Sequence, residues 1–179
     1  SEGRPGHVSS FDEYLYDLAI FHRRLAARYS GVPMFLFGHS MGGLIASNYL
    51  LHHQRDFVGG ILSGPAIKTD LQPGQVQMML LRLLALLVPR AGMLKLNAQG
   101  VSRDPEVVRK YIEDPLVFHG KMSVRMIREL FAGMSAVQAG AASITLPMLL
   151  LHGGADVMTA PEGSRFLYEH IGSSDKALK

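Results

Sequence analysis

The sequence has no cysteine, little net charge and no apolar run long enough to cross a bilayer. Without cysteine, neither a disulfide framework nor a thiolate metal site can form. A formal net charge of +3 over 179 residues, with no run dense in Lys and Arg, argues against a nucleic-acid partner. No group of His, Asp and Glu has the spacing of metal ligands. We therefore expect no metal, no other cofactor and no nucleic-acid contact.

The composition is that of a globular protein. Hydrophobic residues make up 47% of the chain and charged residues 18%, and 179 residues are enough for one domain with a sizeable core. The first seven residues are polar and turn-like, unlike a signal peptide. We therefore expect a cytoplasmic protein or one that lies at a membrane surface. Because Ser1 rather than Met comes first, we also expect the chain to be cut from something longer.

The most informative motif lies between a short apolar run, residues 34–37, and a run of small and apolar residues that begins at Met41. The first run predicts a buried strand and the second a helix, and Gly38-x-Ser40-x-Gly42 joins them in the nucleophile-elbow pattern. Such a turn strains its central residue, and flanking glycines let the strand and the helix approach closely. Ser40 is therefore the candidate nucleophile, and the backbone N–H of Met41 a candidate oxyanion donor. The alternative is a purely structural strand–turn–helix connection.

The segments around this motif predict an α/β fold with a doubly wound, mostly parallel sheet. Short apolar runs indicate buried strands over residues 34–37, 58–62 and 146–152. Three- and four-residue spacing of apolar side chains indicates helices over residues 10–29, 41–53 and 161–171. Strand, helix and strand in this order form a right-handed parallel crossover. A further strand begins in residues 176–179.

A serine nucleophile needs a base to take its proton and a carboxylate to orient that base. Asp156 follows the third predicted strand in a loop of small residues, where functional groups gather in open α/β sheets, and is the candidate acid. Asp70 is the alternative acid. Only His170 follows Asp156, and it lies in a predicted helix, which is not the place of a catalytic base on this fold. His152, at the end of a strand, is expected to be an ordinary residue.

Between the two predicted core segments, residues 1–65 and 144–179, the composition changes. Residues 66–143 read as wholly helical, with helices over 75–88, 104–112 and 123–139, which predicts a helical cap inserted into the sheet domain. The helix of residues 76–88 is apolar nearly all round but too short to span a bilayer. It is either buried between cap and core or an exposed apolar lip that admits lipid or rests on a membrane. Met78, Met79 and Leu83 are candidates for the lining of an acyl tunnel.

These motifs resemble those of the monoacylglycerol lipase/lysophospholipase branch of the α/β-hydrolases, also called the serine aminopeptidase-like branch. The resemblance runs over nearly the whole chain and is carried by Phe11-Asp12-Glu13-Tyr14, Gly38-His39-Ser40-Met41-Gly42-Gly43, Ile61-Leu62-Ser63-Gly64-Pro65 and Leu149-Leu150-Leu151-His152-Gly153-Gly154-Ala155-Asp156. It implies Ser40 as nucleophile, Asp156 as triad acid and Met41 as an oxyanion donor. It also implies that the catalytic His and the second oxyanion loop lie outside these 179 residues.

The resemblance implies a serine hydrolase that cleaves the acyl ester of a monoacylglycerol or lysophospholipid through an acyl-enzyme on Ser40. A short-chain carboxylesterase, thioesterase or peptidase on the same fold is one alternative. A non-catalytic fragment or binding protein that lacks the triad His is another. The expected partners are a lipid ester and a membrane surface touched by the cap, and the oligomeric state stays open.

Overall fold

The computed structural model describes residues 3–69 and 73–179, so the alternative acid Asp70 lies outside the described residues. The chain divides into two compact units. The sheet unit comprises residues 12–70 and 132–179, and the smaller unit comprises residues 1–11 and 71–131. The division into a core and a cap at residues 66 and 143 stays a prediction.

The sheet unit is built on four parallel strands. They lie in the order β1 (Phe35–His39), β2 (Gly59–Ser63), β5 (Met148–Leu151) and β6 (Lys176–Leu178). Every neighbouring pair is parallel. The predicted parallel sheet and each of its predicted strands are therefore confirmed, with ends that differ by one or two residues. Because the strands are parallel, the loops that follow β1, β2 and β5 all lie at the same edge of the sheet.

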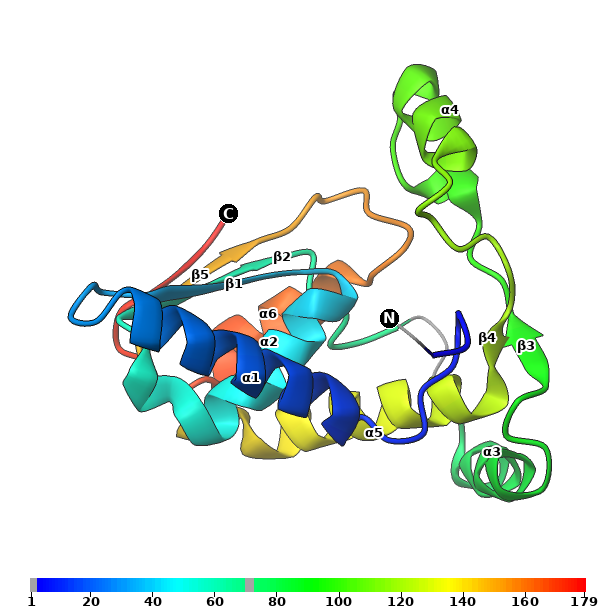
Figure 1. Cartoon of the computed structure of the whole chain (residues 1–179), viewed down its shortest axis with the longest axis horizontal. Helices are drawn as coiled ribbons and strands as arrows, with labels where there is room; N and C mark the ends of the chain where they lie inside the picture. The colour runs from blue at the N-terminus through cyan, green and yellow to red at the C-terminus, as the bar shows by residue number, and fades with distance from the viewer. Residues whose placement is uncertain (1–2, 70–72) are drawn as a thin grey trace. The chain divides into compact units, whose positions relative to one another are not determined.

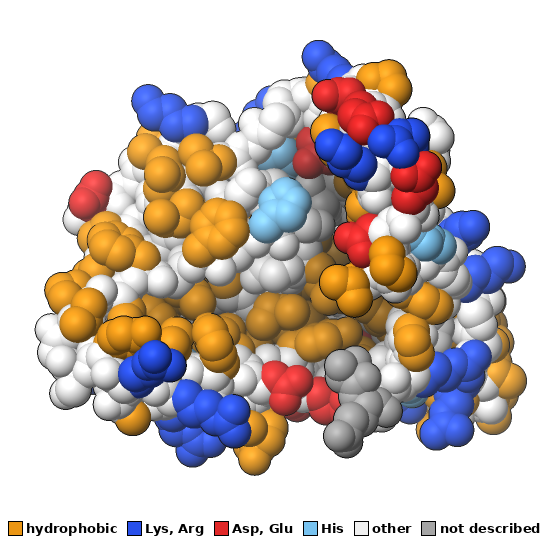
Figure 2. Space-filling model, turned by 45° about the horizontal axis from the view of Figure 1, so that its top comes forward, with side chains coloured by type: hydrophobic (Ala, Val, Ile, Leu, Met, Phe, Trp, Pro, Cys, Tyr) orange, Lys and Arg blue, Asp and Glu red, His pale blue; other side chains and the backbone are white. Residues whose placement is uncertain are grey.

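Helices cover one face of this sheet. α1 (Asp12–Arg28), α2 (Met41–His53) and α6 (Pro161–His170) lie on the same side of the strands in Figure 1. Leu36 of β1, Leu62 of β2 and Leu150 of β5 have their side chains on that face, and all three are buried. On the opposite face, Phe35 and Phe37 are 63% and 62% exposed. Hydrophobic side chains occupy much of the surface drawn in Figure 2.

The prediction that residues 66–143 are wholly helical is wrong, because the smaller unit also contains strands. Besides α3 (Gln75–Leu87), η2 (Ala98–Gly100) and α4 (Pro105–Glu113), it contains the strands β3 (Gly92–Leu94) and β4 (Met122–Ser123), which pair antiparallel. Strands of two and three residues are too short to show the alternation that marks a strand in the sequence. α5 (Val124–Gly140) begins in this unit and ends in the sheet unit, where η3 (Ala141–Ser143) follows it.

α3 packs against the rest of its unit through one side of the helix. Leu81 and Ala85 are buried in a small core with Val124 and Ile127 of α5. Met78 and Leu84 pack beside this core. Six other apolar side chains of α3 are largely exposed, each between 51% and 74%: Val76, Met79, Leu80, Leu83, Leu86 and Leu87. None of the helices in the described part of the chain is both long and apolar enough to span a membrane.

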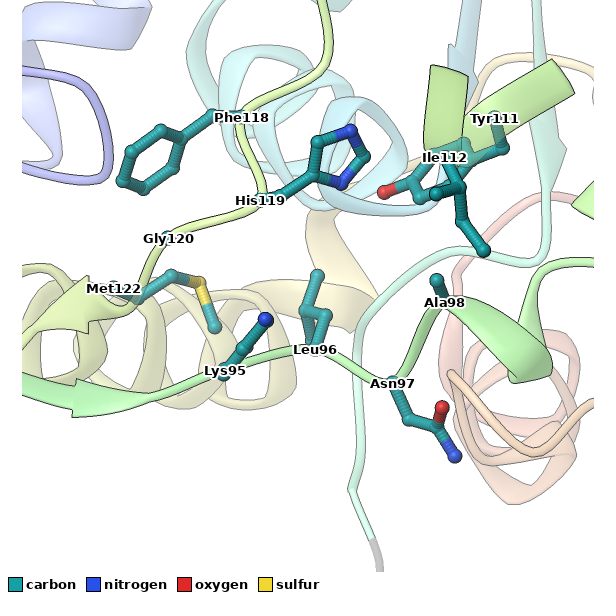
Figure 3. Close-up of a pocket in the computed structure, with 10 residues that line it drawn as sticks. All are labelled: Lys95, Leu96, Asn97, Ala98, Tyr111, Ile112, Phe118, His119, Gly120 and Met122. Carbon is teal, nitrogen blue, oxygen red and sulfur yellow. The ribbon is translucent and has the colours of Figure 1, made fainter. Parts of the chain in front are cut away.

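The smaller unit contains a pocket of about 480 Å³ between the segment after β3 and the segment that joins α4 to β4 (Figure 3). Leu96, Ile112 and Phe118 give it an apolar lining. The rings of Tyr111 and His119 meet edge to face across 5.7 Å at one side. The lining residues do not include Met78, Met79 or Leu83, so their role in an acyl tunnel stays a prediction.

The glycines of the elbow motif differ in whether a side chain would fit at their positions. A Cβ on Gly38 would lie 2.5 Å from the carbonyl oxygen of Gly42, and one on Gly43 would lie 2.7 Å from the Cβ of Pro65. A Cβ on Gly42 would meet no atom of the described residues within 4 Å, apart from its own helix and chain neighbours. β1 and α2 therefore approach closely where Gly38 faces the backbone carbonyl of Gly42, and Gly43 lies close to Pro65 in the turn after β2. Neither contact requires position 42 itself to lack a side chain.

Substituting these two glycines is expected to separate their roles. In Gly38→Ala the new Cβ meets backbone that cannot move aside, so the free energy of unfolding should fall by about 2–3 kcal/mol. In Gly42→Ala it meets open space in a helix, so that free energy should stay the same or rise by up to about 1 kcal/mol. Urea unfolding of both variants measures the difference. Equal losses of stability in Gly38→Ala and Gly42→Ala would show that close backbone contact does not set Gly38 apart.

Candidate active site

Ser40 sits at the sharp turn between β1 and α2 in a strained backbone conformation. Its φ is +52°, and it is the only residue other than glycine with positive φ in the described part of the chain. Backbone hydrogen bonds hold this conformation: Ser40 N donates to Ser63 O at 3.0 Å, and Ser40 O accepts from Ala66 N at 3.0 Å. The strain predicted for the centre of the elbow is therefore present. Such strain persists only where the surroundings over-determine it.

Met41 is the first residue of α2, directly after Ser40. The first N–H groups of a helix have no carbonyl one turn earlier to bond, and the helix dipole makes this end electropositive. The Ser40 side chain does not cap the helix by a hydrogen bond. The N–H of Met41 is therefore in a position suited to an anionic oxygen bound at Ser40.

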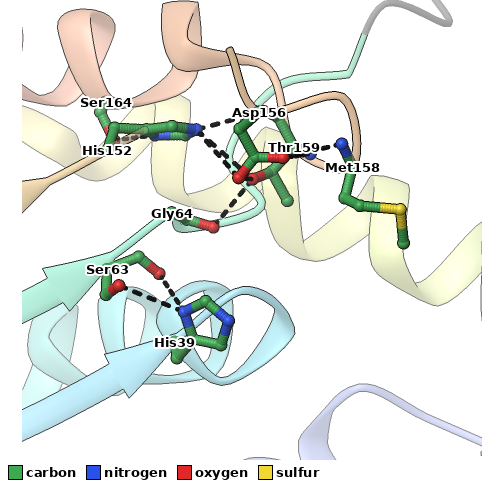
Figure 4. Close-up of polar contacts among 8 residues, drawn as sticks. All are labelled: His39, Ser63, Gly64, His152, Asp156, Met158, Thr159 and Ser164. Carbon is green, nitrogen blue, oxygen red and sulfur yellow. Dashed lines mark hydrogen bonds and ion pairs between the residues drawn. The ribbon is translucent and has the colours of Figure 1, made fainter. Parts of the chain in front are cut away.

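Asp156 lies on the loop after β5, and its carboxylate is held by a cradle of three hydrogen bonds (Figure 4). Oδ1 accepts from Met158 N at 2.7 Å and from Thr159 N at 3.0 Å. Oδ2 accepts from Thr159 Oγ1 at 3.0 Å. Burial alone raises the pKa of Asp156, but these hydrogen bonds and the nearby His152 outweigh it, so the pKa lies below its ordinary value. The side chain is 24% exposed, which leaves it reachable from outside the cradle.

His152 belongs to the same cluster, and its non-catalytic role stays a prediction. Its side chain is only 3% exposed, and its Nε2 lies 3.7 Å from Asp156 Oδ2. Nδ1 makes a 2.7 Å hydrogen bond with Ser164 Oγ, and Nε2 lies 3.1 Å from the carbonyl oxygen of Thr159. Sequence reasoning missed both His152 and Thr159. The available signal was their spacing from Asp156, since a loop folded back on an aspartate brings residues at i−4 and i+3 beside it.

His39 and His170 make structural contacts. His39 Nδ1 lies 2.9 Å from Ser63 O, so the ring is tied to the neighbouring strand end. His170 bonds Phe166 O through Nδ1 at the end of α6, as the sequence predicts for a helix-terminal residue. Within the described residues, no histidine hydrogen-bonds to the Ser40 hydroxyl, and no group of three or more His, Asp or Glu could hold a metal ion.

The chain is similar to several known hydrolases. The model of the serine aminopeptidase S33 family matches residues 1–179. A monoacylglycerol lipase from Mycolicibacterium smegmatis is 33% identical over 179 residues, which are 100% of this chain and 64% of that protein. A caffeoylshikimate esterase from Arabidopsis thaliana is 33% identical over 168 residues, which are 90% of this chain and 51% of that protein.

The fold agrees with these sequence matches. The crystal structure of the Paleococcus ferrophilus monoacylglycerol lipase matches with a TM-score of 0.85 at 33% identity, covering 98% of this chain and 66% of that one. The chain thus spans about half to two thirds of the length of these relatives.

Proposed function

Because the chain belongs to the serine aminopeptidase S33 family of α/β hydrolases, we propose that the protein is a serine ester hydrolase acting on a lipid monoester. The observation that carries this proposal is the strained Ser40 at the N-terminus of α2, combined with a hydrogen-bonded Asp156 at the same edge of the sheet. A structural strand–turn–helix connection would not need an accessible carboxylate on the loop after β5. The similarity to monoacylglycerol lipases supports the substrate class.

In the proposed reaction, the Ser40 hydroxyl loses its proton to a histidine base and its Oγ attacks the acyl carbonyl carbon. The negative charge that develops on the carbonyl oxygen is stabilised by the N–H of Met41 and the dipole of α2. The base returns the proton to the leaving alcohol, and water then hydrolyses the acyl-enzyme by the same steps. Asp156 accepts a hydrogen bond from the base and holds its orientation. We expect the base outside these 179 residues, because Ser40 has no histidine partner within their described part.

The experiment for this proposal compares substrates on the full-length protein. We expect 1-monolauroylglycerol or 1-monooleoylglycerol to be hydrolysed with a higher kcat/KM than p-nitrophenyl acetate, since a longer chain adds apolar contact that stabilises the transition state. The kcat/KM for lauroyl-lysophosphatidylcholine shows whether the protein accepts a phosphocholine head group in place of glycerol. A flat dependence on acyl length, or no turnover of any glycerol ester, would contradict the lipid assignment.

Two observations favour a different substrate on the same catalytic machinery. The Arabidopsis relative is an esterase of caffeoylshikimate, and the family model carries the description of an aminopeptidase. A fold does not fix its substrate. A p-nitrophenyl ester series and an aminoacyl-p-nitroanilide series on the same preparation would distinguish a short-chain esterase or a peptidase from a lipase.

We propose further that the exposed apolar side of α3 contacts lipid, either as the wall of an acyl tunnel or at a membrane surface. Met79 and Leu83 are 66% and 51% exposed on this side, whereas Met78 packs beside the small core of the unit. Leu86, at 71%, extends the same side toward the end of the helix. An apolar helix side of this size is rare on a protein surface unless it meets a partner, a ligand or a membrane.

A charge placed on this side of α3 should affect long-chain substrates most. We expect Leu83→Asp to lower kcat/KM for 1-monooleoylglycerol at least about fivefold more than for p-nitrophenyl acetate, because a carboxylate in an apolar contact must be desolvated. Leu116→Asp, at a leucine that is 92% exposed outside α3, is the matched control. Sedimentation with phosphatidylcholine vesicles shows whether membrane binding falls in parallel. Equal effects on both substrates, with unchanged vesicle binding, would refute the lipid contact.

A further inference from the structure

We propose that Thr159 is a positioning residue that aims one oxygen of Asp156 at the base and ties the acid loop to the turn that holds Ser40. The inference rests on the proposed function, since it assigns Asp156 the role of triad acid. It concerns contacts inside the sheet unit only. Thr159 itself is 7% exposed and touches no reacting atom in the proposed reaction.

Only one of the two carboxylate oxygens of Asp156 can accept a further hydrogen bond. Oδ1 of Asp156 already accepts two backbone N–H groups, from Met158 and Thr159. Oδ2 has only the Thr159 hydroxyl as a hydrogen-bond donor among the described residues, at 3.0 Å. A carboxylate oxygen can accept about two hydrogen bonds, so Oδ2 has room for one more. Oδ2 is therefore the oxygen that would receive the N–H of the base.

The Thr159 hydroxyl contacts a second oxygen besides Oδ2 of Asp156. Thr159 Oγ1 also lies 3.1 Å from the carbonyl oxygen of Gly64, and its single proton is shared between the two acceptors. In this bifurcated hydrogen bond the ionised carboxylate of Asp156 is the stronger acceptor and the neutral carbonyl of Gly64 the weaker one. The hydroxyl thus lies between the acid loop and the turn after β2 (Figure 4).

The turn after β2 also holds the nucleophile. Ser40 N donates to Ser63 O, and Ala66 N donates to Ser40 O, each at 3.0 Å. On the other side, Gly64 N donates to Leu151 O of β5 at 2.7 Å. The residues from Ser63 to Ala66 therefore bond to the elbow and to the strand that leads into the acid loop. Thr159 adds a side-chain tie from the acid itself.

Two further contacts restrict this arrangement. Gly64 has a φ of +50°, and a Cβ there would lie 3.3 Å from Asp156 Oδ2 and 3.5 Å from Thr159 Oγ1, so the turn fits closely under the carboxylate. His152 Nε2 lies 3.1 Å from the Thr159 carbonyl oxygen and 3.4 Å from Oγ1, which limits the rotation of this residue. The side chain of Thr159 is thereby held in one orientation.

The test compares Thr159→Ser with Thr159→Ala in the full-length protein. Both variants lose the threonine methyl group, so they differ only in the hydroxyl. We expect the serine variant to keep kcat within about threefold of wild type, and the alanine variant to lose about 10- to 100-fold in kcat with KM within twofold, the range typical for residues that orient a catalytic group. The rate of labelling by an alkyl fluorophosphonate should fall in the same proportion. Thr145→Val, which removes a hydroxyl bonded to Gln54 before β5, is the control.

The outcomes separate this inference from the proposed function. If the wild-type protein neither hydrolyses esters nor reacts with the fluorophosphonate, the proposed function fails. If the wild-type protein is active and Thr159→Ala has the same kcat as Thr159→Ser, Thr159 has no positioning role and this inference fails. A loss confined to KM, or a loss of the same size in Thr145→Val, would overturn it as well. Thermal unfolding of each variant confirms that the compared proteins are folded.

Discussion

Replacing Ser40 with alanine in the full-length protein is expected to abolish labelling by an alkyl fluorophosphonate and to lower ester turnover by at least about 10⁴-fold. The reagent forms a covalent bond only with a serine whose proton a base removes, so a merely exposed hydroxyl stays unlabelled. The positive φ of Ser40 and its place at the start of α2 explain why this serine should be selected. Mass spectrometry of the labelled peptide identifies the modified residue.

Ser47→Ala is the matched control for this experiment. Ser47 lies on the same helix but is fully buried, and its hydroxyl donates to Gly43 O at 2.7 Å. Removing that hydrogen bond should cost about 1 kcal/mol of stability and leave the labelling of Ser40 intact. If Ser40→Ala still reacts at the wild-type rate, another residue is the nucleophile. If the wild-type protein does not react at all, the elbow is structural, and the non-catalytic alternative is supported.

The elbow could be predicted from the sequence because its motif is local. A short apolar run, a glycine and a serine directly before a helix predict the strained turn at Ser40, although the hydrogen bonds that hold it come from Ser63 and Ala66. The same reasoning overstated Gly42, because the motif does not tell which glycine meets backbone and which meets open space. The space at Gly38 is limited by the backbone of Gly42 and Gly43 within the elbow, whereas the space at Gly43 is limited by Pro65 after β2.

The cradle of Asp156 shows where sequence reasoning stopped. That Asp156 follows a parallel strand could be read from the pattern, and so could its place at the functional edge of the sheet. The burial of His152 and the contacts of Thr159 depend on how the loop folds back toward Ser164 and Gly64. Likewise, the pairing of β3 with β4 depends on contacts across about 30 residues, and neither strand is long enough to show a period.

Replacing Asp156 with asparagine is expected to lower kcat by about 10³- to 10⁴-fold while leaving the labelled serine the same. Asparagine can still accept from Met158 N and Thr159 N through its carbonyl oxygen. Its NH₂ group would then stand where Oδ2 stands, and it donates where the base needs an acceptor. The base is then left in the wrong orientation or tautomer. Glu162→Gln removes an exposed carboxylate from α6 and serves as the control, with kcat expected within twofold of wild type.

The same substitution should change how stability depends on pH, and the direction follows from the cradle. Burial opposes ionisation of Asp156, but the Thr159 and Met158 hydrogen bonds and His152 outweigh it, so its pKa is lower in the folded protein than its ordinary value of 3.8. The carboxylate therefore contributes stability above about pH 4, and that contribution is lost as the pH falls through the lowered pKa. In Asp156→Asn this contribution is absent at every pH. The difference in unfolding temperature between wild type and Asp156→Asn should thus be largest near pH 7 and shrink below pH 4, and a difference that grows on acidification would refute the cradle as the cause.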